Sequence, residues 1–102
     1  MDNMEDFKYE IHYTKVADKF FASHENVRVQ YKAAIKELLV GEHPENIDVK
    51  RIKGEKNDYY RIKLGNYRVV YTIVKNKIVV IKTMIAGARN DVYKKMGGLK
   101  LL

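Results

Sequence analysis

Residues 58–74, DYYRIKLGNYRVVYTIV, contain two stretches in which apolar and polar residues alternate, separated by the dipeptide Gly65–Asn66. Alternation of this kind is typical of half-buried β-strands, and a two-residue loop that begins with glycine favours a type II′ hairpin turn. Such a turn would pair Leu64 with Tyr67. We therefore expect a β-hairpin whose register is set by the turn.

The register predicts which side chains share a face, because residues opposed across a hairpin project to the same side of the sheet. The apolar side, which we expect to meet the core, carries Tyr60, Ile62, Leu64, Tyr67, Val69 and Tyr71. The opposite side carries Tyr59, Arg61, Lys63, Arg68 and Thr72. Like charges opposed across a hairpin destabilise it by up to about 1 kcal/mol per pair, so this cluster suits an anionic ligand. A solvated surface of a lysine-rich protein would show the same alternation.

Strands are also predicted on both sides of the hairpin, in the β-branched segments 49–53 and 77–85. Gly54 with Asn57–Asp58 marks the turn before the hairpin, and Lys75–Lys77 marks the turn after it. These segments and the hairpin should form four consecutive antiparallel strands. The alternating segment Lys8–Tyr13 predicts a further strand near the N-terminus.

Two helices are predicted between the first strand and the second. Thr14 is a candidate N-cap for a short helix that breaks near Ser23 and His24. Apolar residues then recur at spacings of three and four from Val27 to Leu39, and Gly41 is a natural left-handed cap. The following residues, 42–48, indicate a loop. After Gly87 closes the sheet, Asn90 or Asp91 could cap a short helix that runs through Met96.

The expected architecture is α+β, with two N-terminal helices packed on one face of a mainly antiparallel sheet of four to five strands and a short C-terminal helix. The length of 102 residues fits a single domain, 1–102. The net charge of +7 favours a polyanionic partner. The chain has no cysteine, its N-terminus lacks an apolar signal segment, and no apolar run is long enough to span a bilayer, so we expect a cytoplasmic protein without a membrane partner.

The segment Lys50–Lys95 resembles the C-terminal half of RelE-type toxins of the RelE/ParE toxin–antitoxin superfamily. Four pieces carry the resemblance in order: KRIKG, YYRIKL, NYRVVY and GARNDVY. The resemblance implies a fold similar to compact microbial ribonucleases. It also implies a ribosome-dependent endoribonuclease that cleaves mRNA in the decoding site and needs no metal or other cofactor.

The resemblance further implies a catalytic set of Arg61, Lys63, Arg68, Arg89 and Tyr93. Lys63 would be the base for the 2′-hydroxyl, with its ammonium form destabilised by the neighbouring arginines. Arg61 and Arg68 would stabilise the phosphate, Arg89 would be the general acid or a further phosphate clamp, and Tyr93 would stack on or hydrogen-bond the nucleotide. Further RNA contacts are expected from Tyr59, Lys53, Lys82, Lys94 and Lys95.

Partners implied by the resemblance are a RelB-like antitoxin in a hetero-oligomer, mRNA and the small ribosomal subunit. The apolar tail Leu99–Leu102 is either a contact for the antitoxin or a frayed end. Two other functions remain open: a ParE-like gyrase poison, and a non-catalytic module that binds nucleic acid or antitoxin. The three histidines lack the spacing of metal ligands, and Glu55 and Asp58 are interpreted as turn residues.

Overall fold

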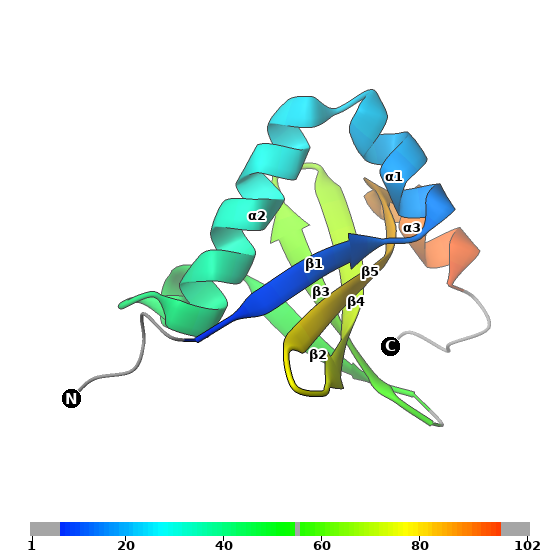
Figure 1. Cartoon of the computed structure of the whole chain (residues 1–102). Helices are drawn as coiled ribbons and strands as arrows, with labels where there is room; N and C mark the ends of the chain where they lie inside the picture. Colours follow the sequence, from blue (N-terminus) through cyan, green and yellow to red (C-terminus); the bar gives the residue numbers. More distant parts are fainter. Residues whose placement is uncertain (1–6, 55, 97–102) are drawn as a thin grey trace.

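The computed structural model describes residues 7–54 and 56–96, and the tail Leu99–Leu102 lies outside them. The elements follow the order β1 (Tyr9–Tyr13), α1 (Lys15–Ala22), α2 (Glu25–Val40), the 3₁₀ turn η2 (Pro44–Asn46), β2 (Val49–Lys53), β3 (Asp58–Leu64), β4 (Tyr67–Lys75), β5 (Val79–Ala88) and α3 (Arg89–Lys95) (Figure 1). The five strands form one sheet in the order β1-β5-β4-β3-β2. Only the β1–β5 pair is parallel. The predicted fold class is confirmed.

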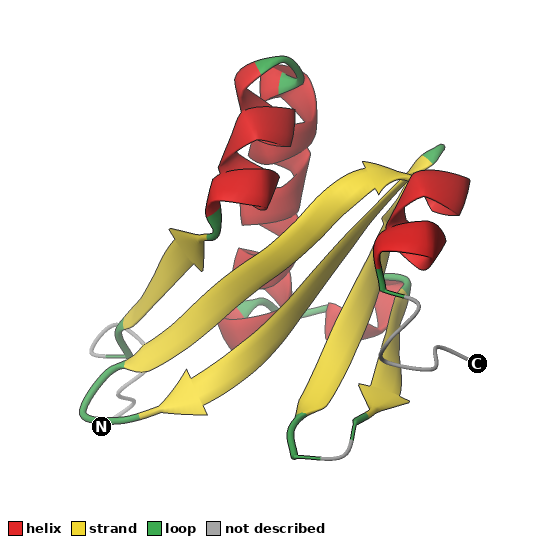
Figure 2. Cartoon of the chain, turned by 90° about the vertical axis from the view of Figure 1, so that its right-hand side faces the viewer, coloured by secondary structure: helices red, strands yellow, loops and turns green. Residues whose placement is uncertain are grey.

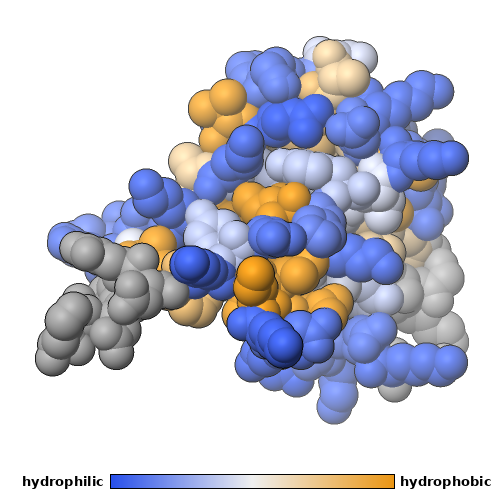
Figure 3. All heavy atoms as spheres, viewed as in Figure 1, coloured by the Kyte–Doolittle hydropathy of each residue, from blue (hydrophilic) through white to orange (hydrophobic). Residues whose placement is uncertain are grey.

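The helices lie on both faces of the sheet. The pair α1 and α2 covers one face, and α3 packs at one end of the other face (Figure 2). On the face shown in Figure 3, polar side chains surround small separate apolar areas, because the helix pair buries most of the apolar surface. No helix in residues 7–54 or 56–96 combines the length and apolar character that crossing a bilayer requires.

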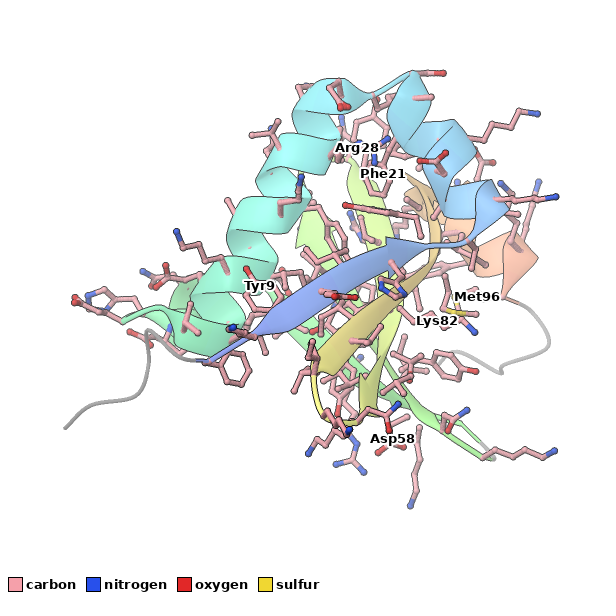
Figure 4. All side chains as sticks on the ribbon, viewed as in Figure 1. Tyr9, Phe21, Arg28, Asp58, Lys82 and Met96 are labelled. Atoms are coloured by element: carbon pink, nitrogen blue, oxygen red, sulfur yellow. The ribbon has the colours of Figure 1, made fainter. Side chains whose placement is uncertain are left out.

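The core lies between the sheet and the helix pair. Phe21 and Tyr31 stack with their ring centroids 5.7 Å apart and are fully buried against the apolar side of the sheet. The guanidinium of Arg28 lies over the rings of Tyr13 and Phe21, 5.0 and 5.4 Å from their centroids, between the two helices (Figure 4). Arg28 also pairs with Glu25 at 3.0 Å. Helix α2 is therefore held in place by the packing of its buried face on the core and by the ion pair between Arg28 and Glu25 in its first turn.

The β3–β4 hairpin has the predicted register. Leu64 pairs with Tyr67 and Lys63 pairs with Arg68, so the apolar and basic residues separate onto the two faces as expected. Gly65 has a φ of +62°, in the left-handed region that primed hairpin turns require. Space is not the constraint, because a Cβ added there would meet nothing within 4 Å.

Replacing Gly65 with alanine should lower the free energy of unfolding by about 1 kcal/mol, because a residue with a Cβ is sterically strained in the left-handed conformation. Gly65→Asn is the matched control, since asparagine tolerates this region, and it should cost clearly less. Urea unfolding of the three proteins measures the difference. Equal stability of the alanine and asparagine variants would show that the turn does not impose this φ.

A β-bulge between β4 and β5 was not predicted. Val70 pairs with Ile85 but Tyr71 pairs with Thr83, so Met84 is an extra residue on β5. The Thr14 hydroxyl donates to the Met84 carbonyl at 2.6 Å, and the buried hydroxyls of Tyr31 and Thr83 are 2.7 Å apart. The bulge changes the alternation of β5, so Ile85 joins Val70 on the face beneath α3 instead of entering the main core.

The helix termini partly match the prediction. Thr14 caps α1 and accepts a hydrogen bond from the Ala17 N–H at 3.1 Å. The expected left-handed conformation of Gly41 is wrong, because its φ is −83° and its backbone is extended. The carboxylate of Glu37 lies where a Cβ of residue 41 would be and accepts from the His43 N–H at 2.7 Å, so a larger residue there would displace only the end of this side chain.

Two other boundaries also need correction. The predicted loop 42–48 contains the 3₁₀ turn η2, which begins at Pro44, where the fixed φ of proline is compatible with a helical turn. Strand β5 continues past Gly87, and α3 begins at Arg89 with Ala88 as N-cap rather than Asn90 or Asp91. The earlier start makes Arg89 the first residue of the helix.

Alkaline pH should destabilise the fold through its core tyrosines. Burial raises the pKa of Tyr71 to about 12, and burial also raises that of Tyr31. An unfolded tyrosine ionises near pH 10. The unfolded state therefore loses protons first, and the free energy of unfolding should fall as pH rises from about 10 to 12. Urea unfolding across this range should show a shallower pH dependence for Tyr71→Phe than for the wild type or for Tyr9→Phe on the edge strand. An unchanged slope would contradict this origin.

Candidate active site

The face opposite the helix pair brings the predicted basic residues together. Arg61 and Lys63 on β3 and Arg68 on β4 all project to this side. It is not a uniformly open surface, because Val92 of α3 and Met96, the residue after this helix, pack against Val70 there, with Tyr59 and Ile85 beside them. The arginines thus lie beside a small second core. The sequence predicted the helix but not the face that it covers.

Arg61 is largely enclosed, with 15% of its side chain exposed. Its Nη1 lies 3.4 Å from Oδ1 of Asp48, and the Asp48 carbonyl accepts a hydrogen bond from the Lys63 N–H at 3.0 Å. Asp48 therefore links the loop before β2 to the basic strand and orients Arg61. Nothing in the sequence indicated this carboxylate beyond its place in a loop.

Arg68 is positioned by the hairpin turn. Its Nη1 donates to the Gly65 carbonyl at 3.0 Å and to the Tyr67 carbonyl at 3.1 Å. The Arg68 side chain also contributes to lowering the pKa of the Tyr93 phenol. A guanidinium held on one side by backbone carbonyls presents its remaining donors as a fork suited to phosphate.

Tyr93 on α3 is a tyrosine whose phenol is affected by several of these cations. Arg89 lies one helical turn before it on α3, with its Cζ 5.6 Å from the centroid of the Tyr93 ring. Hydrogen bonding and positive charge from Arg89, together with Arg61 and Arg68, lower the pKa of the Tyr93 phenol, against a smaller opposing effect of burial. Three guanidinium groups from β3, β4 and α3 therefore act on one hydroxyl. Tyr93 itself is 39% exposed and open to a ligand.

A model of the family described as "ParE toxin of type II toxin-antitoxin system, parDE" matches residues 5–90, most of the chain. The chain belongs to this family of toxins. Among solved structures it is similar to the crystal structure of the RelB–RelE antitoxin–toxin complex from Methanococcus jannaschii, with a TM-score of 0.55 and 26% identity over 82% of this chain and 96% of that chain. No curated protein matches the chain. The resemblance to RelE-type toxins of the RelE/ParE superfamily is confirmed.

Lys63 of the toxin shares the basic face and sits directly opposite Arg68. Its side chain is exposed, so water solvates its ammonium group and screens the nearby arginines. The expectation that those arginines destabilise the charged form stays a prediction. Tyr93 is the group on which the arginines act, so it joins Lys63 as a candidate for proton transfer.

The residues expected to bind RNA do not form one surface in the toxin. Lys82 lies on the basic face, in register with Thr72, and Lys94 and Lys95 are exposed on α3. Tyr59 is half-buried beside Val70 and Met96, so it offers less stacking surface than expected. Lys53 on β2 is in register with Asp58 on β3, and by strand alternation its side chain projects to the opposite face of the sheet.

The histidines of the toxin occupy separate places. His12 contacts Glu10 at 2.8 Å and His43 contacts Glu45 at 3.2 Å, both on the surface. His24 is half-buried at the junction of α1 and α2. Within the described ranges, no three His, Asp or Glu side chains gather in a group that could hold a metal ion.

Proposed function

We propose that this toxin is a ribosome-dependent endoribonuclease that cleaves mRNA in the decoding site and so inhibits translation. One observation carries the proposal: Arg61, Lys63 and Arg68 share one face of the β3–β4 hairpin, and Arg89 lies over the ring of the partly exposed Tyr93, whose phenol pKa the arginines lower. Permanently charged guanidinium groups stabilise the charge that develops on a phosphate during transfer, and a phenol of lowered pKa is a better proton donor.

In the proposed reaction the 2′-hydroxyl of one nucleotide attacks the adjacent phosphorus. Lys63, in its neutral form, takes the proton from the 2′-oxygen as the new P–O bond forms. Arg61 and Arg68 bind the non-bridging phosphate oxygens. The bond to the 5′-oxygen breaks, Tyr93 gives that oxygen its proton, and Arg89 stabilises the resulting phenolate. The products are a 2′,3′-cyclic phosphate and a free 5′-hydroxyl, and no metal takes part.

The ribosome has a physical role in this proposal. A single acid or base contributes about 10²- to 10⁴-fold, and orientation of the reacting groups contributes more. A small site with one exposed lysine base should therefore need its substrate held in line by the decoding site. The small subunit and mRNA are the proposed partners, and we accordingly propose that the chain acts in the cytoplasm. Residues 1–102 are proposed to form a single domain.

We also propose a cognate, RelB-like antitoxin as partner in a toxin–antitoxin hetero-oligomer. Two findings support it: the family is that of a toxin–antitoxin system, and the similar RelE structure is of a complex with RelB. A gyrase poison is the second candidate function, because the matching family model is named for ParE toxins. A non-catalytic binding module is the third.

Expression of the wild type beside Lys63→Ala and Arg68→Ala separates these functions. The proposal predicts growth arrest with cut messenger ends for the wild type, and loss of both effects in the two variants. Growth arrest with DNA breaks and intact messengers, kept by both variants, would favour the gyrase poison. Arrest without either lesion would favour the binding module.

A further inference from the structure

A cleft of about 810 Å³ lies between α1, the start of β4, the end of β5 and α3. Its volume is within the range of roughly 300–1,000 Å³ usual for small-molecule sites. The side chains that give it chemical character are Phe20, His24, Tyr67, Lys19, Lys95 and Asp91. None of these six was assigned to the reaction above.

Three aromatic rings form one wall of the cleft. Phe20 and His24 are stacked at 4.0 Å with an interplanar angle of 8°, and Tyr67 meets them edge-on at 5.4 and 5.2 Å. The His24 Nδ1–H donates to the Phe20 carbonyl at 2.9 Å, which fixes the tautomer and the ring orientation. All three rings are half-buried. A rigid, partly exposed aromatic wall is the kind of surface on which a nucleobase stacks.

Charged groups form the rim of the cleft. Lys19 on α1 and Lys95 on α3 are exposed, as is Asp91 on α3. Among the described residues none of the three makes an ion pair. Two free ammonium groups suit a phosphate, and a free carboxylate suits a base edge that presents two neighbouring N–H donors. Guanine has such an edge, with N1–H beside its amino group.

Two residues that line the cleft are adjacent in sequence to arginines of the candidate active site. Tyr67 lines the cleft and the next residue, Arg68, projects to the other face. Ala88 lines the cleft and is followed by Arg89. The start of β4 and the end of β5 therefore separate the two places, and a single strand of RNA passing around them would reach both.

We propose that this cleft binds the base of a nucleotide flanking the cleaved bond, with preference for guanine. The aromatic wall stacks on the base, Asp91 accepts from its N1–H and amino group, and Lys19 and Lys95 contact its phosphate. The inference rests on the proposed ribonuclease function, which supplies the RNA. An apolar peptide side chain is the rival occupant.

Proton NMR of the histidine rings tests the inference without requiring cleavage. The wild-type chain is titrated with each of the four nucleoside 5′-monophosphates. Guanosine monophosphate should shift the His24 ring protons through stacking, with His12 and His43 as internal controls in the same spectrum. Asp91→Asn should reduce the preference for guanine over the other bases by about tenfold, because a paired hydrogen-bond contact to a base edge is lost.

A matched pair of lysine variants separates the cleft from general charge. Lys95→Ala should weaken binding more than Lys94→Ala, since only Lys95 lines the cleft. The inference is overturned if all three histidines shift alike, if all four bases bind equally to the wild type, or if His24 responds only to an apolar peptide. Binding of guanosine monophosphate without messenger cleavage would instead count against the proposed function alone.

Discussion

Replacing Arg68 with alanine should lower messenger cleavage on programmed ribosomes by about 10²- to 10³-fold, the loss typical of removing one preorganised donor to a developing negative charge. Arg68 is held by the Gly65 and Tyr67 carbonyls at 3.0 and 3.1 Å, so its fork is oriented before substrate arrives. Arg68→Lys should recover only part of the rate, because an ammonium cannot reproduce the fork. Single-turnover cleavage assays measure both variants.

Lys75→Ala is the matched control for Arg68, because it removes an exposed cation from the far end of the same strand. It should retain nearly full activity. The thermal midpoint of Arg68→Ala should change little, since the lost hydrogen bonds lie at a half-exposed turn. A well-folded Arg68→Ala protein that cleaves at the wild-type rate would remove the phosphate-stabilising role of this arginine.

Replacing Tyr93 with phenylalanine should lower the cleavage rate by about 10²-fold or more while leaving ribosome affinity nearly unchanged. The variant keeps the ring beneath Arg89 but lacks the hydroxyl that the proposal uses as an acid. Arginines lower the pKa of this phenol, so the wild-type rate should fall as pH rises through that pKa. The alkaline limb of the pH profile should be absent from Tyr93→Phe.

Tyr93→Ala distinguishes proton donation from stacking. If the ring alone matters, Tyr93→Phe will cleave like the wild type and only Tyr93→Ala will fail. Arg89→Ala provides a second check, because loss of its guanidinium should raise the pKa of the Tyr93 phenol toward its ordinary value and move the alkaline limb to higher pH. An unmoved limb would contradict the assignment of that limb to Tyr93.

The hairpin could be predicted from sequence because local rules decide it. Period-two alternation and a glycine at the turn determined the pairing of Lys63 with Arg68, and the structure has that pairing. The bulge at Met84 could not be predicted, since it depends on Thr14 and Tyr31, which lie in distant segments of the chain. The bulge also puts Ile85 on the face that α3 covers, and alternation alone does not reveal this.

The candidate site likewise has one part that local sequence rules predict and another that depends on tertiary contacts. Arg61, Lys63 and Arg68 were placed together by strand register, but the contact of Arg61 with Asp48 arises only when the loop before β2 folds back onto β3. The combined effect of Arg89, Arg61 and Arg68 on the pKa of the Tyr93 phenol likewise depends on where α3 begins and which face it meets. Tertiary packing therefore adds Arg89 and Tyr93 of α3 to the face that carries the basic strand pair.

Mapping of messenger ends on programmed ribosomes tests the central claim most directly. Purified toxin is added to ribosomes with a known codon in the decoding site, and to the same transcript alone. The account predicts a cut within that codon only on the ribosome, leaving a 2′,3′-cyclic phosphate and a 5′-hydroxyl, with none in the presence of Arg68→Ala. An intact messenger on the ribosome, with DNA breaks when the same protein meets gyrase, would contradict it.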